Sequence, residues 1–228
     1  MKKRYEKLIL ADEKVSEELK TADGRENYFQ TLLKQAKSHD LYDLLVESLS
    51  IQGEIIELGV WRGVTTRRIG AVMKTSGVDK KIYACDSFEG FGSDTITKED
   101  TSLFRSANRL QKKFTAAGDV PQVLEQFFDH YKIKGFCVEG FFSNSLKVIE
   151  GEKFCFAHVD CDAYSSHVDC LNFIYPRLSP GGYIVFDDYN EKKWPGATKA
   201  IDEFFDDKPE NIKLSDKKEN SAWYVIKL

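Results

Sequence analysis

The sequence predicts an α/β fold with a mostly parallel sheet and a terminal antiparallel hairpin. Short runs that are apolar throughout alternate with stretches of helical periodicity, which is typical of strands covered by helices on both faces. Two segments, 211–214 and 222–228, flank a polar turn near the end of the sequence and indicate the hairpin. The predicted strands are residues 54–58, 81–85, 135–138, 154–159, 182–186 and 222–226.

The composition of the 228 residues favours a globular protein over a disordered or membrane-spanning one. Hydrophobic residues make up 42%, charged residues make up 31%, and no apolar run approaches the roughly 20 residues of a membrane helix. The net charge of −4 argues against a nucleic-acid partner. The five cysteines show no C-x-x-C spacing and favour a reducing compartment, so we expect a cytoplasmic protein without membrane attachment.

The first 50 residues are predicted to be helical. Phe29, Leu32, Leu33 and Ala36 follow the i, i+3, i+4, i+7 spacing of an amphipathic helix. We therefore divide the chain into a helical leader at 1–50, which could serve as a lid or an oligomer interface, and an α/β domain at 51–228. Homo-oligomer formation is an open alternative.

Helices are also predicted at 165–178 and at 196–206. The first is expected to end before Pro180, and the second has Pro195 at its first turn, where proline is favoured. Residues 91–119 are polar and lack periodicity. The length of this segment fits a lid over a site, although a solvated loop explains it equally well.

The segment Glu54–Gly63 (EIIELGVWRG) is predicted to form a strand, a tight turn and the start of a helix. Gly59 allows a sharp turn and the close approach of a ligand. Trp61 occupies the place of the second glycine of the dinucleotide motif, which argues against a pyrophosphate at this turn. Glu57 would repel a phosphate but attract an ammonium group. The alternative is a turn that binds nothing.

Asp86 ends the next predicted strand, in the segment CDSFEG. An acid at this position can accept hydrogen bonds from the hydroxyls of a ribose, although a turn aspartate is the alternative. Together with Glu57, this feature indicates a nucleoside that carries a positive charge and little phosphate. S-adenosylmethionine meets that description.

Four aspartates follow two further predicted strands: Asp160, Asp162, Asp187 and Asp188. Adjacent strands of a sheet lie about 5 Å apart, so these carboxylates would crowd one rim and need a cation. Oxygen ligands favour Mg²⁺ and, after it, Mn²⁺ or Ca²⁺. Capping and turn aspartates are the alternative. We expect His158 to be a core residue and keep His167 as a candidate contact of the acceptor.

These motifs, in this order, resemble the macrocin O-methyltransferase family of metal-dependent sugar methyltransferases. The similarity covers roughly residues 50–207 and includes D-x-D-x-Y-x-S, PGGY-x-x-x-DDY and the segment Trp194-Pro195-Gly196. The resemblance implies a Rossmann-like class I methyltransferase fold with a seven-stranded sheet. The sequence departs from the family pattern at Val64, Ala163 and His167, and residues 91–119 match poorly.

The resemblance also implies roles for individual residues. It assigns Asp160, Asp187 and Asp188 to Mg²⁺, and Asp162 to the general base. The expected S-adenosylmethionine contacts are Glu57, Gly59, Gly63, Asp86, Ser87, Glu139, Gly140 and Asp160.

The expected reaction is in-line transfer of a methyl group to a hydroxyl of a sugar or similar vicinal diol, with the hydroxyl polarised by the metal ion. The acceptor is a small molecule that the sequence does not identify, and a catechol is a further option. Two other functions remain open. One is a metal-dependent glycosyltransferase of the D-x-D type, and the other is a non-catalytic binding module on a methyltransferase fold.

Overall fold

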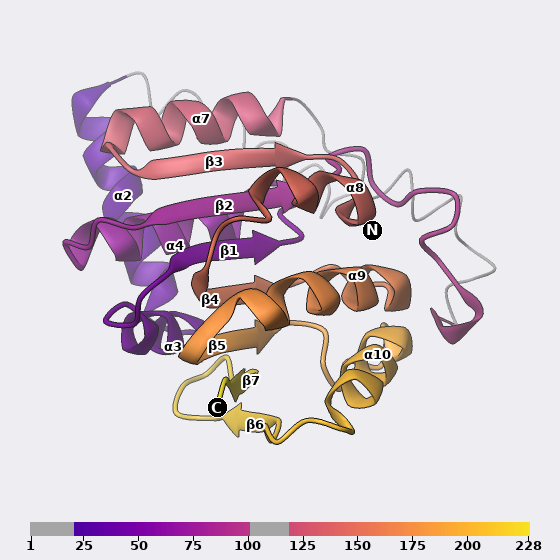
Figure 1. The fold of residues 1–228 in the computed structure, drawn as a ribbon. Helices are drawn as coiled ribbons and strands as arrows, with labels where there is room; N and C mark the ends of the chain where they lie inside the picture. Colours follow the sequence, from indigo (N-terminus) through magenta and orange to yellow (C-terminus); the bar gives the residue numbers. More distant parts are fainter. Residues whose placement is uncertain (1–20, 101–118) are drawn as a thin grey trace.

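The computed structural model describes residues 21–100 and 119–228 of the chain. Its strands are β1 (Glu54–Leu58), β2 (Lys81–Asp86), β3 (Lys134–Glu139), β4 (Phe154–Val159), β5 (Leu178–Phe186), β6 (Lys213–Ser215) and β7 (Ala222–Ile226). They form one seven-stranded sheet in the order β3-β2-β1-β4-β5-β7-β6. All neighbours are parallel except β7, which runs antiparallel to both β5 and β6. The predicted fold class is therefore confirmed (Figure 1).

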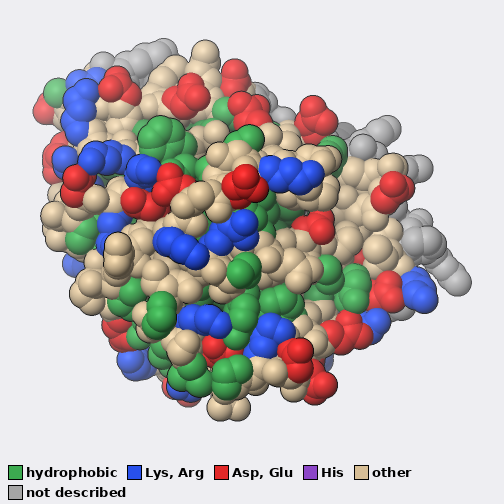
Figure 2. Space-filling view, in the orientation of Figure 1, with side chains coloured by type: hydrophobic (Ala, Val, Ile, Leu, Met, Phe, Trp, Pro, Cys, Tyr) green, Lys and Arg blue, Asp and Glu red, His purple; other side chains and the backbone are tan. Residues whose placement is uncertain are grey.

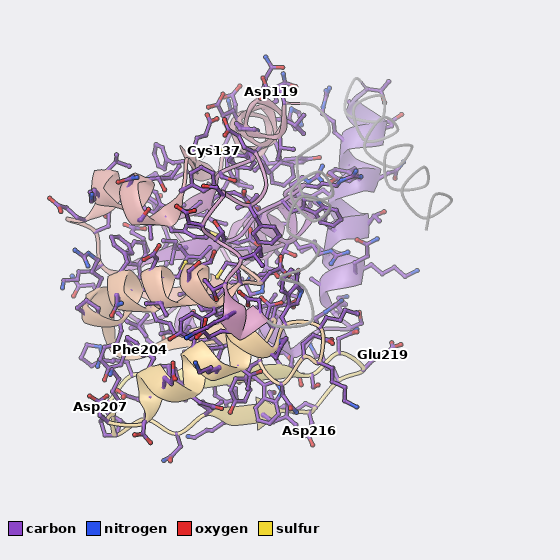
Figure 3. The ribbon with its side chains drawn as sticks, turned by 90° about the vertical axis from the view of Figure 1, so that its right-hand side faces the viewer. Asp119, Cys137, Phe204, Asp207, Asp216 and Glu219 are labelled. Carbon is purple, nitrogen blue, oxygen red and sulfur yellow. The ribbon has the colours of Figure 1, made fainter. Side chains whose placement is uncertain are left out.

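Helices cover both faces of this sheet. The helical elements are α2 (Ala22–Ala36), α3 (Asp40–Ser48), α4 (Val64–Thr75), η1 (Lys98–Asp100), α7 (Val120–Tyr131), α8 (Phe142–Ser145), η2 (Leu146–Ile149), α9 (Tyr164–Ile174), η3 (Tyr175–Arg177) and α10 (Pro195–Phe205). Figure 3 looks toward the carboxyl ends of the parallel strands and shows α2 on one side of the sheet and α9 and α10 on the other. The arrangement has three layers, as expected for strands that are apolar on both faces.

Each face of the sheet has its own hydrophobic core, because successive side chains of a strand point to opposite faces. Ile55 of β1 belongs to a core shared with α2, α3, α4 and α7. Its neighbour Ile56 belongs to a second core shared with η2, α9 and α10. Both side chains are fully buried.

The described part of the predicted leader packs into the first of these cores. Tyr28, Leu32 and Ala36 of α2 and Leu45 of α3 are buried there together with residues of the sheet. Residues 21–50 are thus continuous with the α/β core. A further role for this segment as a lid or an oligomer interface stays a prediction.

The helix predicted at 165–178 is shorter than expected. The α-helix α9 ends at Ile174, and a single 3-10 turn, η3, follows it. Pro176 has no backbone N–H to continue the helix. Leu178 already belongs to β5, where it pairs with Phe154. The sequence pattern missed this early start because β5 is irregular between its first residues and Tyr183.

The carboxyl ends of β1 to β5 meet at one edge of the sheet, and residues 87–100 extend beyond that edge (Figure 1). Of the predicted lid at 91–119, residues 101–118 lie outside the described part of the chain. Within the described ranges, no helix has the length and apolar character needed to cross a bilayer. Acidic and basic side chains are interspersed on the face drawn in Figure 2.

Candidate active site

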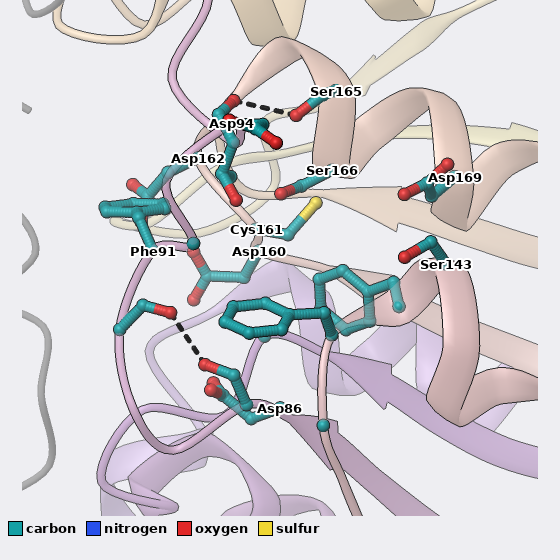
Figure 4. Close-up of a pocket in the computed structure, with 18 of the residues that line it drawn as sticks. Asp86, Phe91, Asp94, Ser143, Asp160, Cys161, Asp162, Ser165, Ser166 and Asp169 are labelled. Carbon is teal, nitrogen blue, oxygen red and sulfur yellow. Dashed lines mark hydrogen bonds between the residues drawn. The ribbon is translucent and has the colours of Figure 1, made fainter.

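A pocket of about 770 Å³ opens at the carboxyl ends of the parallel strands. Ligands of open α/β sheets bind at this edge. The pocket brings together most of the residues predicted from sequence, and Figure 4 shows several of them around it. Predicted residues that line it are Gly59, Asp86, Ser87, Gly140, Asp160, Asp162 and Asp187; those that do not are Glu57, Gly63, Glu139 and Asp188.

Gly59 forms the tight turn at the end of β1. Its φ is +96°, and a Cβ added to it would lie 1.9 Å from the carbonyl oxygen of Asp160. Only glycine fits where the backbones after β1 and β4 approach so closely. Gly63, with φ +69°, precedes α4, and a Cβ there would lie 2.7 Å from Leu124. The structure therefore gives Gly63 a packing role outside the pocket lining.

Asp86, at the end of β2, holds the neighbouring turns in place. Its Oδ2 accepts hydrogen bonds from the backbone N–H groups of Val60 (2.7 Å) and Trp61 (2.8 Å), and its Oδ1 accepts one from Phe88 (2.7 Å). Trp61 and Phe88 have positive φ, a conformation that costs energy for these residue types. A carboxylate offers about four acceptor positions, so these three bonds leave about one for a ligand.

Glu57 is almost fully buried and does not line the pocket. One carboxylate oxygen accepts a hydrogen bond from the hydroxyl of Thr66 in α4. The other lies 3.1 Å from Nδ1 of His158 on β4, which is 2% exposed. His158 is a buried histidine with a partner, as predicted. The pair also places a buried imidazole beside the acidic rim.

The acidic rim predicted from sequence exists in the structure. Asp160 and Asp187 line the pocket, and one ligand atom from each lies within 4.8 Å of a ring nitrogen of His158. Asp188 is 3% exposed, and its Oδ2 accepts the backbone N–H of Asp162 at 2.8 Å. Burial and the neighbouring Asp187 raise the pKa of Asp160 well above its usual range, and the same two causes raise the pKa of Asp188 to about 7.

The donors at this rim fit a divalent cation. Two carboxylates and an imidazole at mutual distances of less than 4.8 Å can share one ion after a small approach, because metal–ligand bonds are about 2.1 Å long. The raised pKa values of Asp160 and Asp188 also point to a cation, because buried carboxylates this close together are unfavourable in their ionised form without a compensating positive charge. Asp188 is a neighbour of His158, Asp160 and Asp187 but is not one of the three side chains that gather around this point.

The metal-free protein is expected to lose stability as the pH rises from 5 to 8. The pKa of Asp188 is raised in the folded state, so the folded state binds more protons than the unfolded state between about pH 4 and pH 7, and the free energy of unfolding falls through that window. Asp160 acts in the same direction. Burial lowers the pKa values of His39 and His130, and these two groups oppose the trend.

Urea denaturation at pH 5.5 and pH 8 in the presence of a chelator measures this effect. A divalent ion should restore stability most strongly at the higher pH, because the carboxylates are then ionised. Greater stability of the chelator-treated protein at pH 8 than at pH 5.5 would contradict the expectation.

The described part of the predicted lid forms one wall of the pocket. Phe91 and Ile96 pack with Ala163, Trp194 and Ala197 in a small hydrophobic cluster that is separate from both cores. A hydrogen bond from Ser165 Oγ to the carbonyl of Thr95 (2.7 Å) joins the same wall to α9 (Figure 4). Residues 91–100 are therefore fixed to the amino ends of α9 and α10.

Asp100 makes the most buried part of this attachment. The side chain is fully buried, and its Oδ1 accepts the backbone N–H of Tyr164 (3.0 Å) at the first turn of α9. Its Oδ2 accepts the backbone N–H and the hydroxyl of Thr97. Gly196 leaves room for this carboxylate, since a Cβ there would lie 2.0 Å from Oδ1. Asp100 thus caps α9 from a position distant in sequence.

Substitution Asp100→Ala is expected to destabilise the protein by about 3 kcal/mol, because it leaves the partly buried N–H groups of Thr97 and Tyr164 without their acceptor. It should also increase amide hydrogen exchange at residues 91–100, measured by mass spectrometry. Glu99→Gln is the matched control and should change much less, because the half-buried Glu99 pairs at 3.4 Å with the exposed Lys199 and glutamine keeps its shape. Equal effects of the two substitutions would show that Asp100 does not anchor the wall.

The pocket contains further residues that sequence reasoning did not select. Phe141 and Phe142 follow Gly140 directly, so their position after the strand was a usable signal. In Figure 4, Asp169 of α9 lies beside Ser143 of α8, at the end of the pocket opposite Asp94 and Asp162. Other lining residues are Trp61, Gly90, Phe91, Gly92, Ser93, Thr95, Asn144, Cys161, Ser165, Ser166 and Lys193. His167 is fully buried and does not line the pocket, so the structure does not support an acceptor contact for it.

Comparison with known proteins supports the same family as the sequence motifs. Mycinamicin III 3''-O-methyltransferase of Micromonospora griseorubida is 31% identical over 163 residues, which cover 68% of this chain and 61% of that protein. Demethyldecarbamoylnovobiocin O-methyltransferase of Streptomyces niveus is 26% identical over 159 residues, or 68% of this chain and 59% of that protein. The match thus spans about three fifths of the length of these relatives.

Solved structures share the fold. The calicheamicin methyltransferase CalS11 has a TM-score of 0.71 at 22% identity and covers 82% of this chain and 77% of its own. The O-methyltransferase NovP has a TM-score of 0.66 at 20% identity, with 84% and 79% covered. The expected class I methyltransferase fold is therefore confirmed. A model of the macrocin-O-methyltransferase (TylF) family matches residues 11–224, so the chain belongs to that family.

Proposed function

We propose that the protein is an S-adenosylmethionine-dependent O-methyltransferase that uses a divalent metal ion and acts on a sugar hydroxyl of a small molecule. The observation that carries this proposal is the position of Asp162, which lines the same pocket as Gly59, Asp160 and Asp187. A candidate base, a glycine turn and an acidic rim are thus combined in one cavity. The names of the relatives support the class of acceptor, since one of them is a 4'-O-methyltransferase of a rhamnosyl-tetracenomycin.

The cofactor would lie across the ends of β1, β2 and β3. The Gly59 turn lines the pocket where the methionine part would lie, and Asp86 offers its remaining acceptor position to a ribose hydroxyl. Gly140 and Ser87 border the adenosine side, next to Phe141 and Phe142. Glu57, Gly63 and Glu139 would act indirectly, since they do not line the pocket.

In the proposed reaction, the acceptor hydroxyl loses its proton to a carboxylate oxygen of Asp162 as the oxygen–methyl bond forms and the sulfur–methyl bond breaks. The products are the methyl ether and S-adenosylhomocysteine. A divalent ion, when bound, would stabilise the negative charge that develops on the acceptor oxygen. Asp160 and Asp187 would hold this ion, with Asp188 beside them. The wall at 91–100 would orient the acceptor and restrict water.

Two measurements test the proposal. Isothermal titration calorimetry should detect S-adenosylhomocysteine binding, while a nucleoside diphosphate sugar, the ligand of the rival glycosyltransferase, should not bind. Mass spectrometry of reactions with S-adenosylmethionine, Mg²⁺ and a panel of sugar-bearing acceptors should reveal a methylated product that disappears with chelator. Binding of the sugar nucleotide alone would favour the rival, and cofactor binding without turnover on any acceptor would favour a binding module.

A further inference from the structure

We propose that His158 is a ligand of the metal ion, oriented by Glu57, and that the resulting nitrogen-and-oxygen site binds Mn²⁺ more tightly than Mg²⁺. This inference rests on the metal site of the proposed function. It adds a nitrogen donor to a site for which the sequence indicates oxygen ligands alone. It also gives Glu57, which does not line the pocket, a specific role at the pocket's edge.

The first argument is the position of the imidazole. A ring nitrogen of His158 and one carboxylate oxygen each from Asp160 and Asp187 lie within 4.8 Å of one another. Asp160 and Asp187 line the pocket, which provides a path for an ion from solvent. Asp188 is turned to the backbone N–H of Asp162 instead. The three side chains that gather around one point are thus two aspartates and a histidine.

The second argument is the hydrogen bond between the ring and Glu57. Nδ1 of His158 lies 3.1 Å from Oε1 of Glu57, and Glu57 is itself fixed by the hydroxyl of Thr66. When Nδ1 is protonated and its N–H donates a hydrogen bond to Glu57, Nε2 is left with a free lone pair. Histidines that bind metals almost always donate their second ring nitrogen to a carboxylate or carbonyl in this way. Among the described residues, the side chain of His158 makes no other hydrogen bond.

The choice of ion follows from the donor set. Mg²⁺ strongly prefers oxygen ligands and retains its waters, whereas Mn²⁺ accepts carboxylates and lies in the series of metals that also bind imidazole. A nitrogen donor therefore contributes more to Mn²⁺ binding than to Mg²⁺ binding. Removal of the imidazole should narrow the difference in affinity between the two ions.

Electron spin-echo envelope modulation of Mn²⁺ bound to the full chain, recorded without cofactor or acceptor, tests the inference directly. Wild-type protein should show ¹⁴N modulation from a coordinated imidazole, and His158→Gln should abolish it. His130→Gln is the matched control and should keep the modulation, because His130 is an exposed residue of α7. Circular dichroism should confirm that each variant remains folded.

Titration of the same proteins with Mn²⁺ and Mg²⁺ gives the second readout. We expect His158→Gln to weaken Mn²⁺ binding by about 10- to 100-fold and Mg²⁺ binding much less, and Glu57→Gln to weaken Mn²⁺ binding by about 10-fold while the ¹⁴N modulation persists. Bound Mn²⁺ without ¹⁴N modulation in the wild type, or modulation that survives in His158→Gln, would overturn the inference and leave the proposed methyl transfer intact. Failure of the wild type to bind either ion would overturn the inference together with the metal site of the proposed function.

Discussion

Substitution Gly59→Ala is expected to lower the free energy of unfolding by at least about 3 kcal/mol and to abolish binding of S-adenosylhomocysteine. The new methyl group would lie 1.9 Å from the carbonyl oxygen of Asp160, and alanine would also have to adopt a φ of +96°. The backbones that follow β1 and β4 would have to separate, and Asp160, which is proposed to hold the metal ion, would move with them. For a protein of this size, the loss corresponds to a fall in Tm of roughly 10 °C.

Gly77→Ala separates the two causes of this effect. Gly77 also has a positive φ, +68°, but a Cβ there would meet nothing within 4 Å. Its substitution should therefore cost only the conformational penalty of about 1–2 kcal/mol and leave ligand binding unchanged. Thermal unfolding and calorimetry of both variants provide the comparison. Similar losses at the two positions would contradict the close contact at Gly59.

For Asp162→Asn, we expect a decrease in kcat of about a hundred- to ten-thousand-fold, with little change in the affinity for S-adenosylhomocysteine. An amide cannot accept the proton of the acceptor hydroxyl. The substitution suits the backbone, since Asp162 has a φ of 60° and asparagine tolerates this left-handed conformation well. The backbone N–H that binds Asp188 is also retained.

The matched control is Asp216→Asn, which removes an exposed carboxylate from the turn between β6 and β7. It should leave both turnover and binding unchanged. Steady-state kinetics on a confirmed acceptor, with calorimetry of S-adenosylhomocysteine, measures the two quantities separately. Turnover of Asp162→Asn within a few-fold of the wild type would exclude Asp162 as the base.

The agreement between sequence and structure is greatest for features that a short segment of the sequence defines, such as a buried strand and the residues at its end. Continuous apolar runs identify β1, β4 and β7 with their observed bounds, because parallel and central strands are buried on both faces. The residues Gly59, Asp86, Asp160, Asp162 and Asp187 could be found for the same reason. Each lies at the end of a strand or within three residues after it, and the ends of parallel strands meet at one edge of the sheet.

Contacts between segments that are distant in the sequence could not be predicted from a local pattern. His158 and Glu57 are 101 residues apart and meet only because β4 lies beside β1. Asp100 caps α9 across 64 residues, whereas Ala163, the residue at the cap position, provides no side-chain bond. The sequence shows that His158, Glu57 and Asp100 are polar, but it does not show their partners, because these depend on how the strands and helices are arranged in the fold. The roles of the pocket's residues in binding and catalysis stay predictions.

The small cluster around Trp194 has a consequence for how this protein can evolve. Phe91, Ile96 and Trp194 pack apart from the two cores that stabilise the sheet, so substitutions among them need not disturb the strands that carry the acidic rim. The wall proposed to contact the acceptor can therefore diverge in shape while the sites proposed for the cofactor and metal ion stay constant. A segment of this kind lets one catalytic framework acquire new acceptors through a few local substitutions.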